Sequence, residues 1–400
     1  MEKYTMKLWY EDKKLDPGIE KFTVGGDTVL DQKLLKYDCK ASIIHARMLE
    51  RNGILSAAER QELETELENL SAEAQTGGFF INPEDEDGHT AIENRLRDKL
   101  GVVGEKIHTG RSRNDQVLTA LRLYIKDELL CVKKSLKSLI GGVRRFSNRW
   151  GRIEMPGFTH TRKAMPSSVG MWAEALVEAL YDDLDQWKAA YALIDQSPLG
   201  SGAGYGIPLD IDRNLSASLL GFSRVQKNPV SCQNSRGKFE GTVLHLLGFI
   251  MFDLHKTASD LVFFTLPDLG FFEIPEDMLT GSSIMPHKRN PDALEILRGY
   301  YHVVLSYEFR VKSLGAGLIS GYHRDFQLMK EPVIQAFEIV RESLFIAGLI
   351  FRSLKAVPGR CKAAMTGELY TVEKAYRLVQ QGIPFREAYR MVAEEWNKKR

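Results

Sequence analysis

Cysteine is scarce in this sequence, and its few copies follow no pattern that would join them. The four cysteines, Cys39, Cys131, Cys232 and Cys361, lie far apart, with no CxxC spacing and no cluster of histidines beside them. A disulfide framework or a zinc site would need such grouping. We therefore expect reduced thiols in the core or at its edge, and neither disulfides nor a metal site.

An excess of charge of either sign is also missing. The 54 basic and 53 acidic residues leave a net charge of +1 at pH 7. No field of the whole molecule therefore favours nucleic acid or an anionic membrane, and any recognition of anions has to be local.

Long apolar runs are absent as well. No stretch approaches the roughly 18 apolar residues that a membrane-spanning helix needs. The N-terminal segment MEKYTMKLWYEDKKLD has no apolar stretch of the kind found in export signals. We expect a soluble, cytoplasmic protein without a nucleic-acid or membrane partner.

What the sequence does contain is apolar residues at helical spacing. With 44% hydrophobic residues over 400 positions, the chain can bury at least one large core. Apolar side chains recur at steps of three or four, with no proline between them, from Val117 to Trp150, a pattern flawed only at Gly141 and Gly142. Similar patterns cover residues 169–194, 239–264, 294–304 and 333–354. We predict an all-α fold around a central bundle of five long helices.

The flanking segments are shorter and more polar, and they suggest three domains. Residues 1–110 form a mainly helical N-terminal domain, in which a polar extended arm precedes a helix over residues 31–52 and a second helix opens with the capping box of Ser56 and Glu59. Residues 111–356 form the bundle. Residues 357–400 form a short C-terminal helical domain, broken by Pro384.

Chemically unusual residues gather in the loops, above all in residues 281–295, GSSIMPHKRNPDALE. A Gly-Ser-Ser opening allows a mobile turn, Pro286 and Pro291 prevent a continuous helix, and Lys288 and Asn290 supply a cation and an amide. Such a loop suits closure over an anion. The alternative is an ordinary solvated loop.

Three further loops precede bundle helices. HTGRSRNDQV, residues 108–117, places donors at a helix N-terminus, where they bind an anion or simply cap the helix. MPGFTHTRKAMP, residues 155–166, holds His160 in a turn between prolines. SGYHRDFQLMKEP, residues 320–332, is either a binding segment or a solvated helix entry. The glycine-rich residues 198–213 lack the strand and helix context of a nucleotide loop.

These loops resemble a known superfamily. GSSxMPxKxN is similar to the signature loop of the fumarase/aspartase superfamily, whose members release fumarate from succinyl-type substrates. HTGRSRNDQ and the PGFTH turn are similar to motifs of the argininosuccinate lyase family. The resemblance implies that Ser282 is the base, with Ser283 as the alternative, and that Lys288 and Asn290 hold a carboxylate.

The same resemblance implies further roles. It makes His160 a catalytic histidine whose imidazole is oriented by Glu295. The expected substrate-binding residues, beyond Asn290, are Arg113, Asn114, Thr159, Tyr322, Gln327, Lys330 and, in the EDxH segment near the active site, His89. Among them, Tyr322, Gln327 and Lys330 would bind the amino-acid half of the substrate.

The reaction that the resemblance implies is β-elimination of argininosuccinate to arginine and fumarate, through a dianionic aci-carboxylate. Concentrated, preorganised donors are the largest expected catalytic contribution to such a reaction. We expect no cofactor and no metal. Because the loops lie far apart on long helices, we also expect a homotetramer in which neighbouring subunits complete each active site.

The resemblance is incomplete in places that bear on the substrate. Gly25 and Gly26 stand where the family offers a serine, residues 236–238 replace an Asp-Arg-Asp pattern, and His287 and Arg289 are more typical of adenylosuccinate lyase. The segment after residue 357 is also short for the family.

Two alternatives follow from these departures. One is a related lyase acting on another N-succinyl amine, such as adenylosuccinate. The other is an inactive, crystallin-like structural homologue. Retention of the four expected catalytic residues argues against the second alternative.

Overall fold

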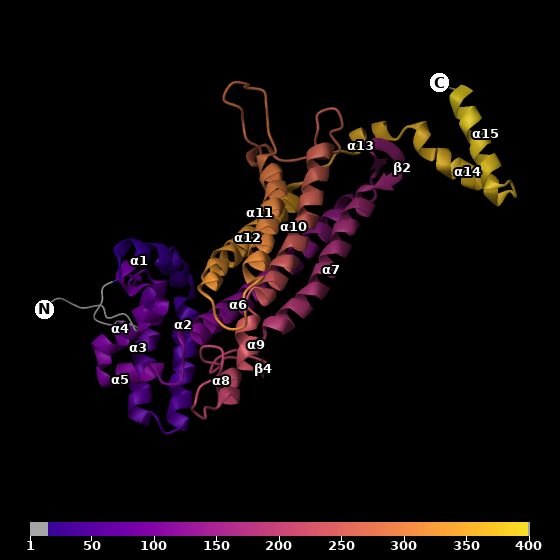
Figure 1. The fold of residues 1–400 in the computed structure, drawn as a ribbon. Helices are drawn as coiled ribbons and strands as arrows, with labels where there is room; N and C mark the ends of the chain where they lie inside the picture. Colours follow the sequence, from indigo (N-terminus) through magenta and orange to yellow (C-terminus); the bar gives the residue numbers. More distant parts are fainter. Residues whose placement is uncertain (1–14, 399–400) are drawn as a thin grey trace. The chain divides into compact units, whose positions relative to one another are not determined.

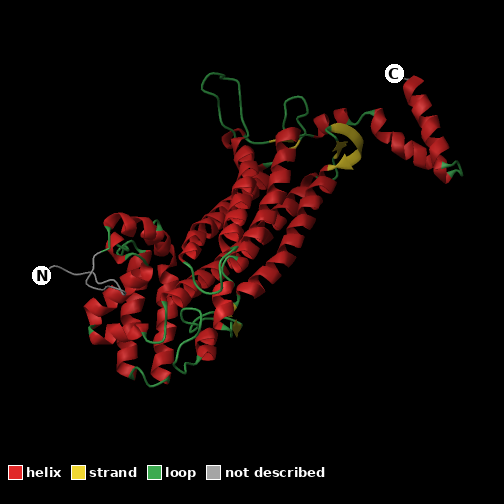
Figure 2. Cartoon of the chain, viewed as in Figure 1, coloured by secondary structure: helices red, strands yellow, loops and turns green. Residues whose placement is uncertain are grey.

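A computed structural model describes residues 15–398, and helices dominate it (Figure 2). Of the extended arm expected before residue 31, residues 1–14 lie outside the described residues, and the prediction for the rest is wrong, because residues 17–24 and 27–30 are helical. Within the described part of the chain, no helix is both long and apolar enough to cross a bilayer.

The N-terminal helices pack on one another around a core of leucine and isoleucine. The capping box is confirmed, because Ser56 Oγ accepts from the Glu59 amide at 3.3 Å and Glu59 Oε2 accepts from the Ser56 amide at 2.8 Å. The elements are α1 (Pro17–Val24), α2 (Asp27–Arg51), α3 (Ala57–Gln75), η1 (Pro83–Asp85), α4 (Gly88–Leu100), α5 (Val102–Glu105) and η2 (Lys106–His108).

The long helices predicted from apolar spacing are confirmed. Gly141 and Gly142 do not interrupt the first of them, since its buried stripe continues on both sides. The five, labelled in Figure 1, are α6 (Arg113–Trp150), α7 (Val169–Ile194), α10 (Lys238–Phe264), α11 (Asp292–Gly315) and α12 (Lys330–Ser353).

Short helices connect the bundle and follow it. Between the long helices lie α8 (Arg213–Leu219), α9 (Pro229–Asn234), η3 (Glu276–Met278) and η4 (Arg324–Met329). After the bundle come α13 (Pro358–Ala364), η5 (Gly367–Tyr370), α14 (Thr371–Gln380) and α15 (Phe385–Lys398). Pro384 stands in the break between the last two helices, as expected.

Strands are few and short. β1 (Glu154–Thr159) pairs antiparallel with β2 (Arg162–Ser168), β3 (Gln196–Ser197) pairs parallel with β4 (Arg224–Val225), and β5 (Phe272–Glu273) pairs antiparallel with β6 (Lys355–Ala356). The β1–β2 hairpin occupies the segment for which the sequence predicted only a turn. Two prolines and a glycine within it obscured its extended character.

The chain divides into two compact units. Unit 1 comprises Met1–Cys131, Gln186–Leu246 and Leu305–Glu338, and unit 2 comprises Val132–Asp185, Leu247–Val304 and Ile339–Arg400. Each of the five long helices contributes residues to both units. The three-domain boundaries inferred from the sequence stay a prediction.

Each unit has its own core contacts between long helices. In unit 1, the rings of Tyr124 on α6 and Phe337 on α12 meet edge to face at 5.9 Å. In unit 2, Trp172 on α7 contacts Phe146 on α6 at 6.3 Å and Phe351 on α12 at 6.0 Å. Ring pairs at such distances add to the free energy gained by burial alone.

Candidate functional site

A polar cavity of about 150 Å³ lies within unit 1. It brings together five residues that the sequence identified from separate loops: Arg113, Asn114, Tyr322, Gln327 and Lys330. The other lining residues are Asp27, Asp31, Asp87, Val117, Arg236 and Arg324.

The start of α6, which carries Arg113 and Asn114, is anchored by the next residue. The buried carboxylate of Asp115 accepts from the amides of Gly200 and Gly202, at 2.8 and 3.1 Å. Both glycines have positive φ, and a Cβ at Gly200 would lie 2.5 Å from a methyl of Ile211. The glycine-rich stretch therefore serves close backbone approach.

Arg113 is held by two carboxylates of the segment that precedes α4. Its guanidinium pairs with Asp87 and lies 3.5 Å from Glu86. Asp87 also caps α4, since its Oδ1 accepts from the Thr90 amide at 2.9 Å. Burial alone would raise the pKa of Asp87, but the positive charges of His89 and Arg113 outweigh burial and lower it.

Lys330, the first residue of α12, is buried between two carboxylates of α2. Its Nζ lies 2.6 Å from Asp31 and 2.8 Å from Asp27, and the residue is 2% exposed. Burial raises the pKa of Asp27 to about 6, although Lys330 acts in the opposite direction. The pKa of Lys330 is raised because its two partners outweigh burial.

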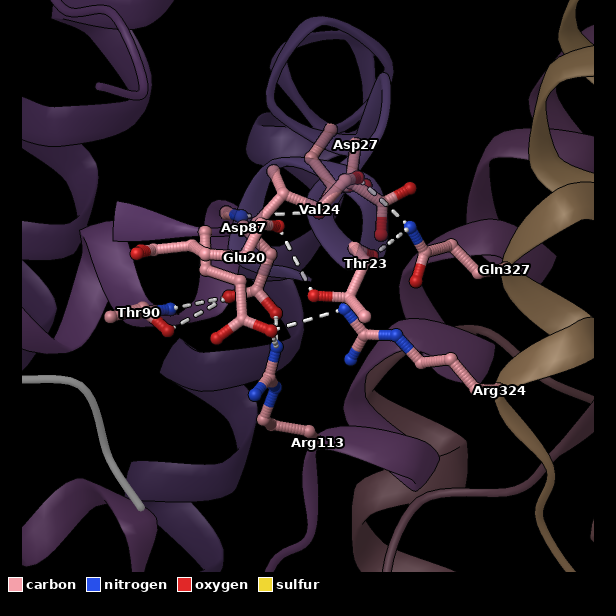
Figure 3. Close-up of polar contacts among 12 residues, drawn as sticks. Glu20, Thr23, Val24, Asp27, Asp87, Thr90, Arg113, Arg324 and Gln327 are labelled. Atoms are coloured by element: carbon pink, nitrogen blue, oxygen red, sulfur yellow. Dashed lines mark hydrogen bonds and ion pairs between the residues drawn. The ribbon is translucent and has the colours of Figure 1, made fainter. Parts of the chain in front are cut away.

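Side chains of η4 donate hydrogen bonds to backbone carbonyls near Gly25. Gln327 Nε2 donates to Thr23 O at 3.0 Å and to Val24 O at 2.9 Å, and Arg324 donates to Thr23 O at 2.8 Å. Figure 3 shows the amide of Gln327 turned toward these two residues. The end of α1 is therefore tied to the cavity through its main chain.

His89 lies beside this cavity but does not line it. It is 3% exposed and forms an ion pair with Asp38, at a second cavity of about 10 Å³ that Asp31 also borders. Burial alone would lower the pKa of His89, but Asp38 and two further carboxylates raise it to about 9. The imidazole is therefore charged at neutral pH.

His160 and Thr159 lie in unit 2, at the tip of the β1–β2 hairpin. His160 and Thr161 form its two-residue turn, with φ of 51° and 58°. This left-handed geometry costs non-glycine residues about 1–2 kcal/mol each. Phe158 packs on Phe263 at 5.2 Å, and Lys163 Nζ donates to the carbonyl of Ala364 at 2.8 Å, so the strands are fixed just below the turn while the imidazole is exposed.

The signature loop also belongs to unit 2. Thr280 and Asn290 exchange backbone hydrogen bonds of 3.0 and 2.9 Å, which close the loop at its base. In Figure 1 the chain between α10 and α11 extends beyond the ends of both helices. Ser282 Oγ accepts from the Met285 amide at 3.2 Å, whereas Lys288 is exposed.

The expected catalytic residues of unit 2 do not meet within the chain. Among residues 15–398, no hydrogen bond or ion pair joins His160 to Glu295 or to Ser282. Glu295 is exposed on the first turn of α11. The orientation of His160 by Glu295 therefore stays a prediction.

Sequence reasoning missed several charged residues that line the cavity. Asp27 and Asp31 stand four positions apart, a spacing that places them on one face of a helix, and that signal was present. Arg236 was noticed only as a departure from the family pattern. For Arg324, the sequence held no signal. No group of three or more His, Cys, Asp or Glu side chains in the described residues is placed to hold a metal.

Comparison with known proteins identifies relatives over nearly the whole chain. Residues 12–305 match the model of a family described as lyase. An argininosuccinate lyase of Thermotoga neapolitana is 51% identical over 98% of this chain and 99% of its own length. One of Sorangium cellulosum is 42% identical over 98% of this chain and 91% of its own.

Solved structures share the fold at lower identity. A class II fumarase of Schistosoma mansoni, 17% identical, has a TM-score of 0.81 over 95% of this chain and 89% of that chain. An EDDS lyase in complex with formate, 22% identical, has a TM-score of 0.80 over 95% of this chain and 76% of that chain.

The buried pair of His89 and Asp38 makes stability depend on pH. The raised pKa of His89 means that the pair stabilises fully below about pH 6.5, its ordinary value, and that this stabilisation is lost as pH rises through about 9. Asp38→Asn should lower the free energy of unfolding by about 3 kcal/mol near pH 6. Urea denaturation at several pH values should show this difference shrinking above pH 9.

Glu338→Gln is the matched control. It removes a pair with Lys33 whose side chains are 44% and 51% exposed, so the change should be below about 1 kcal/mol. A loss in Asp38→Asn that is the same at every pH would contradict the assignment.

Proposed function

We propose, from the premise that this chain belongs to the lyase family and within it to the argininosuccinate lyases, that it cleaves argininosuccinate to arginine and fumarate. The observation that carries the proposal is the unit 1 cavity, in which residues from the loops at 108–117 and 320–332 converge. Identity of 51% with a relative of that name, over nearly the full length of both chains, supports the same substrate.

Removal of the proton is the first step. Ser282 removes a proton from the succinyl carbon next to a carboxylate. The electron pair of the broken C–H bond passes into that carboxylate to give a dianion. Serine is a weak base at its ordinary pKa, so it needs a closed loop that excludes water and places donors around its oxygen. Lys288 and Asn290, in the same loop, would stabilise the dianion.

Cleavage of the carbon–nitrogen bond is the second step. The electron pair of the dianion forms the double bond of fumarate, and the bonding pair leaves on the guanidino nitrogen. His160 donates a proton to that nitrogen, directly or through water, and Glu295 orients the imidazole by accepting a hydrogen bond from the other ring nitrogen. The left-handed turn that presents His160 to solvent supports this role.

Residues of several loops bind the substrate. Arg113 and Asn114 hold a succinyl carboxylate, and Thr159 of a neighbouring subunit contributes to the shared site. Tyr322, Gln327 and Lys330 border the amino-acid half, and the charged His89 stabilises the carboxylates behind the cavity. The position of the five unit 1 residues around one cavity supports their roles.

We propose that the active enzyme is a homotetramer whose sites are shared between subunits. No hydrogen bond or ion pair joins His160 to Ser282 or Glu295 within residues 15–398, so we expect another copy to supply the missing group. Large apolar side chains on the long helices support self-association, because they are left uncovered in the single chain. They are Phe249, Phe252, Ile296, Leu305, Phe309 and Phe345, and each is at least 39% exposed.

The cellular role follows from the products. We propose that the enzyme serves arginine biosynthesis in the cytoplasm. Three of its four unpaired cysteines are buried, which fits a reducing compartment.

The substrate is tested by mixing the purified protein with argininosuccinate or adenylosuccinate and following fumarate by its absorbance. We expect fumarate from argininosuccinate alone. Consumption of adenylosuccinate, with argininosuccinate inert, would instead favour the alternative suggested by His287 and Arg289. Inertness toward both would favour a structural homologue.

Ser282→Ala should lower kcat by roughly 10²–10⁴-fold, the range for loss of a general base. The side chain is partly exposed in a loop, so the free energy of unfolding should change by less than about 0.5 kcal/mol. Initial rates and thermal denaturation provide the two measurements. The neighbouring Ser283→Ala is the control, and a larger loss there would transfer the role of base to Ser283.

Shared sites predict complementation between inactive variants. Ser282→Ala and His160→Asn should each be inactive, yet co-expression should restore part of the activity if one site takes these residues from different copies. Analytical ultracentrifugation of the wild type should show a tetramer. An active monomer would contradict the proposal.

A further inference from the structure

Four cations line the unit 1 cavity, and three of them are neutralised. Arg113, Arg324 and Lys330 each lie within 3.5 Å of at least one carboxylate oxygen. The fourth cation, Arg236, forms no ion pair within the described residues.

Arg236 is deeply buried despite its charge. The residue is 5% exposed, and its Nη1 is buried without a hydrogen-bond partner in residues 15–398. Its guanidinium lies 5.0 Å from the ring centre of Phe326 and 5.4 Å from that of Tyr322. Ring faces attract the cation but do not satisfy its donors.

A buried guanidinium with an unpaired donor destabilises the fold unless a bound ligand accepts a hydrogen bond from it. An uncompensated buried charge costs several kcal/mol, and burial lowers the pKa of Arg236 for the same reason. Buried donors in native proteins are otherwise nearly always paired. Because Arg236 also lines the cavity, its guanidinium is placed to pair with an anion bound there.

The surrounding charges select the kind of anion. Asp27, Asp31 and Asp87 line the same cavity. An α-amino acid suits such a mixture of charges, because it carries its carboxylate next to an ammonium that these carboxylates attract. The cavity volume of about 150 Å³ is roughly tenfold the 10–15 Å³ that one water needs on the same measure, which leaves room for such a head group.

We propose that Arg236 binds the α-carboxylate of the arginine half of the substrate, with the α-ammonium turned toward Asp27. This inference rests on the proposed function and adds to it a specificity residue. The planar guanidinium can donate two parallel hydrogen bonds to one carboxylate, which a lysine cannot. Arg236 would thus distinguish arginine from amines that lack the carboxylate.

The test uses synthesis, in which arginine and fumarate bind as separate molecules. Rates are measured with arginine and with agmatine, which is arginine without its α-carboxylate. Arg236→Gln should lower kcat/KM for arginine by roughly 10–100-fold and change that for agmatine by less than about threefold. The KM for fumarate should be unchanged, and Arg236→Lys should recover part of the loss.

Agmatine can be followed even where it reacts slowly. In that case agmatine is used as an inhibitor of the reaction with arginine, and its inhibition constant is measured instead of kcat/KM. We expect Arg236→Gln to leave this inhibition constant nearly unchanged. Equal losses for arginine and agmatine, or a raised KM for fumarate, would overturn the assignment. Failure of the wild type to consume fumarate with arginine would instead refute the proposed function on which the assignment rests.

Stability separates a binding role from a structural one. Without ligand, Arg236→Gln should unfold at the same or a higher temperature than the wild type, because it removes an uncompensated buried charge. Arg122→Gln is the matched control. Arg122 is 1% exposed, and its two terminal nitrogens donate to Gln196 O and Ser235 Oγ at 2.8 Å, so its loss should lower the unfolding temperature. A similar drop in both variants would make Arg236 structural and overturn the proposal.

Discussion

The ammonium group of Lys330 joins parts of unit 1 that are remote in sequence. It ties the first residue of α12 to Asp31 on α2, 299 positions earlier. Three buried charges are tolerated only when their geometry is close, because each one left alone is costly. A shift of either helix would leave a buried carboxylate unpaired. The contact of Lys330 with Asp27 and Asp31 therefore determines where η4, which directly precedes α12, and its cavity-lining side chains lie. Burial raises the pKa of Asp27 more than Lys330 lowers it, so the lysine does not fully offset the cost of burying this carboxylate.

Most of the helical fold could be predicted from the sequence. The stripe of apolar residues along α6 continues for more than thirty residues, and a pattern of that length has no other stable form in water. The β1–β2 hairpin was missed for a physical reason. Its strand residues include Pro156 and Pro166 and alternate poorly, so pairing between the two strands, rather than local preference, determines their conformation.

The candidate site was predictable only where its residues stand in distinctive loops. Arg113 and Gln327 belong to such loops, and the structure brings them to one cavity. The partners that fix their charge were not predictable, because the pairing of Lys330 with Asp31 is a tertiary contact. In the sequence, Arg236 was only a departure from the family pattern. Its burial beside Tyr322 and its unpaired Nη1, which suggest a role in binding, are visible only in the structure.

The direction in which the His160 imidazole points depends on the register between β1 and β2. Side chains alternate between the faces of a hairpin, so a slip of one residue between β1 and β2 would move His160 to the opposite side. The irregular pairing at Gly157 and Phe158, together with the ring contact of Phe158, opposes that slip. The direction of the imidazole therefore depends on residues next to the turn. Loss of the Phe158 ring, two positions before His160, would change that direction without removing any polar group.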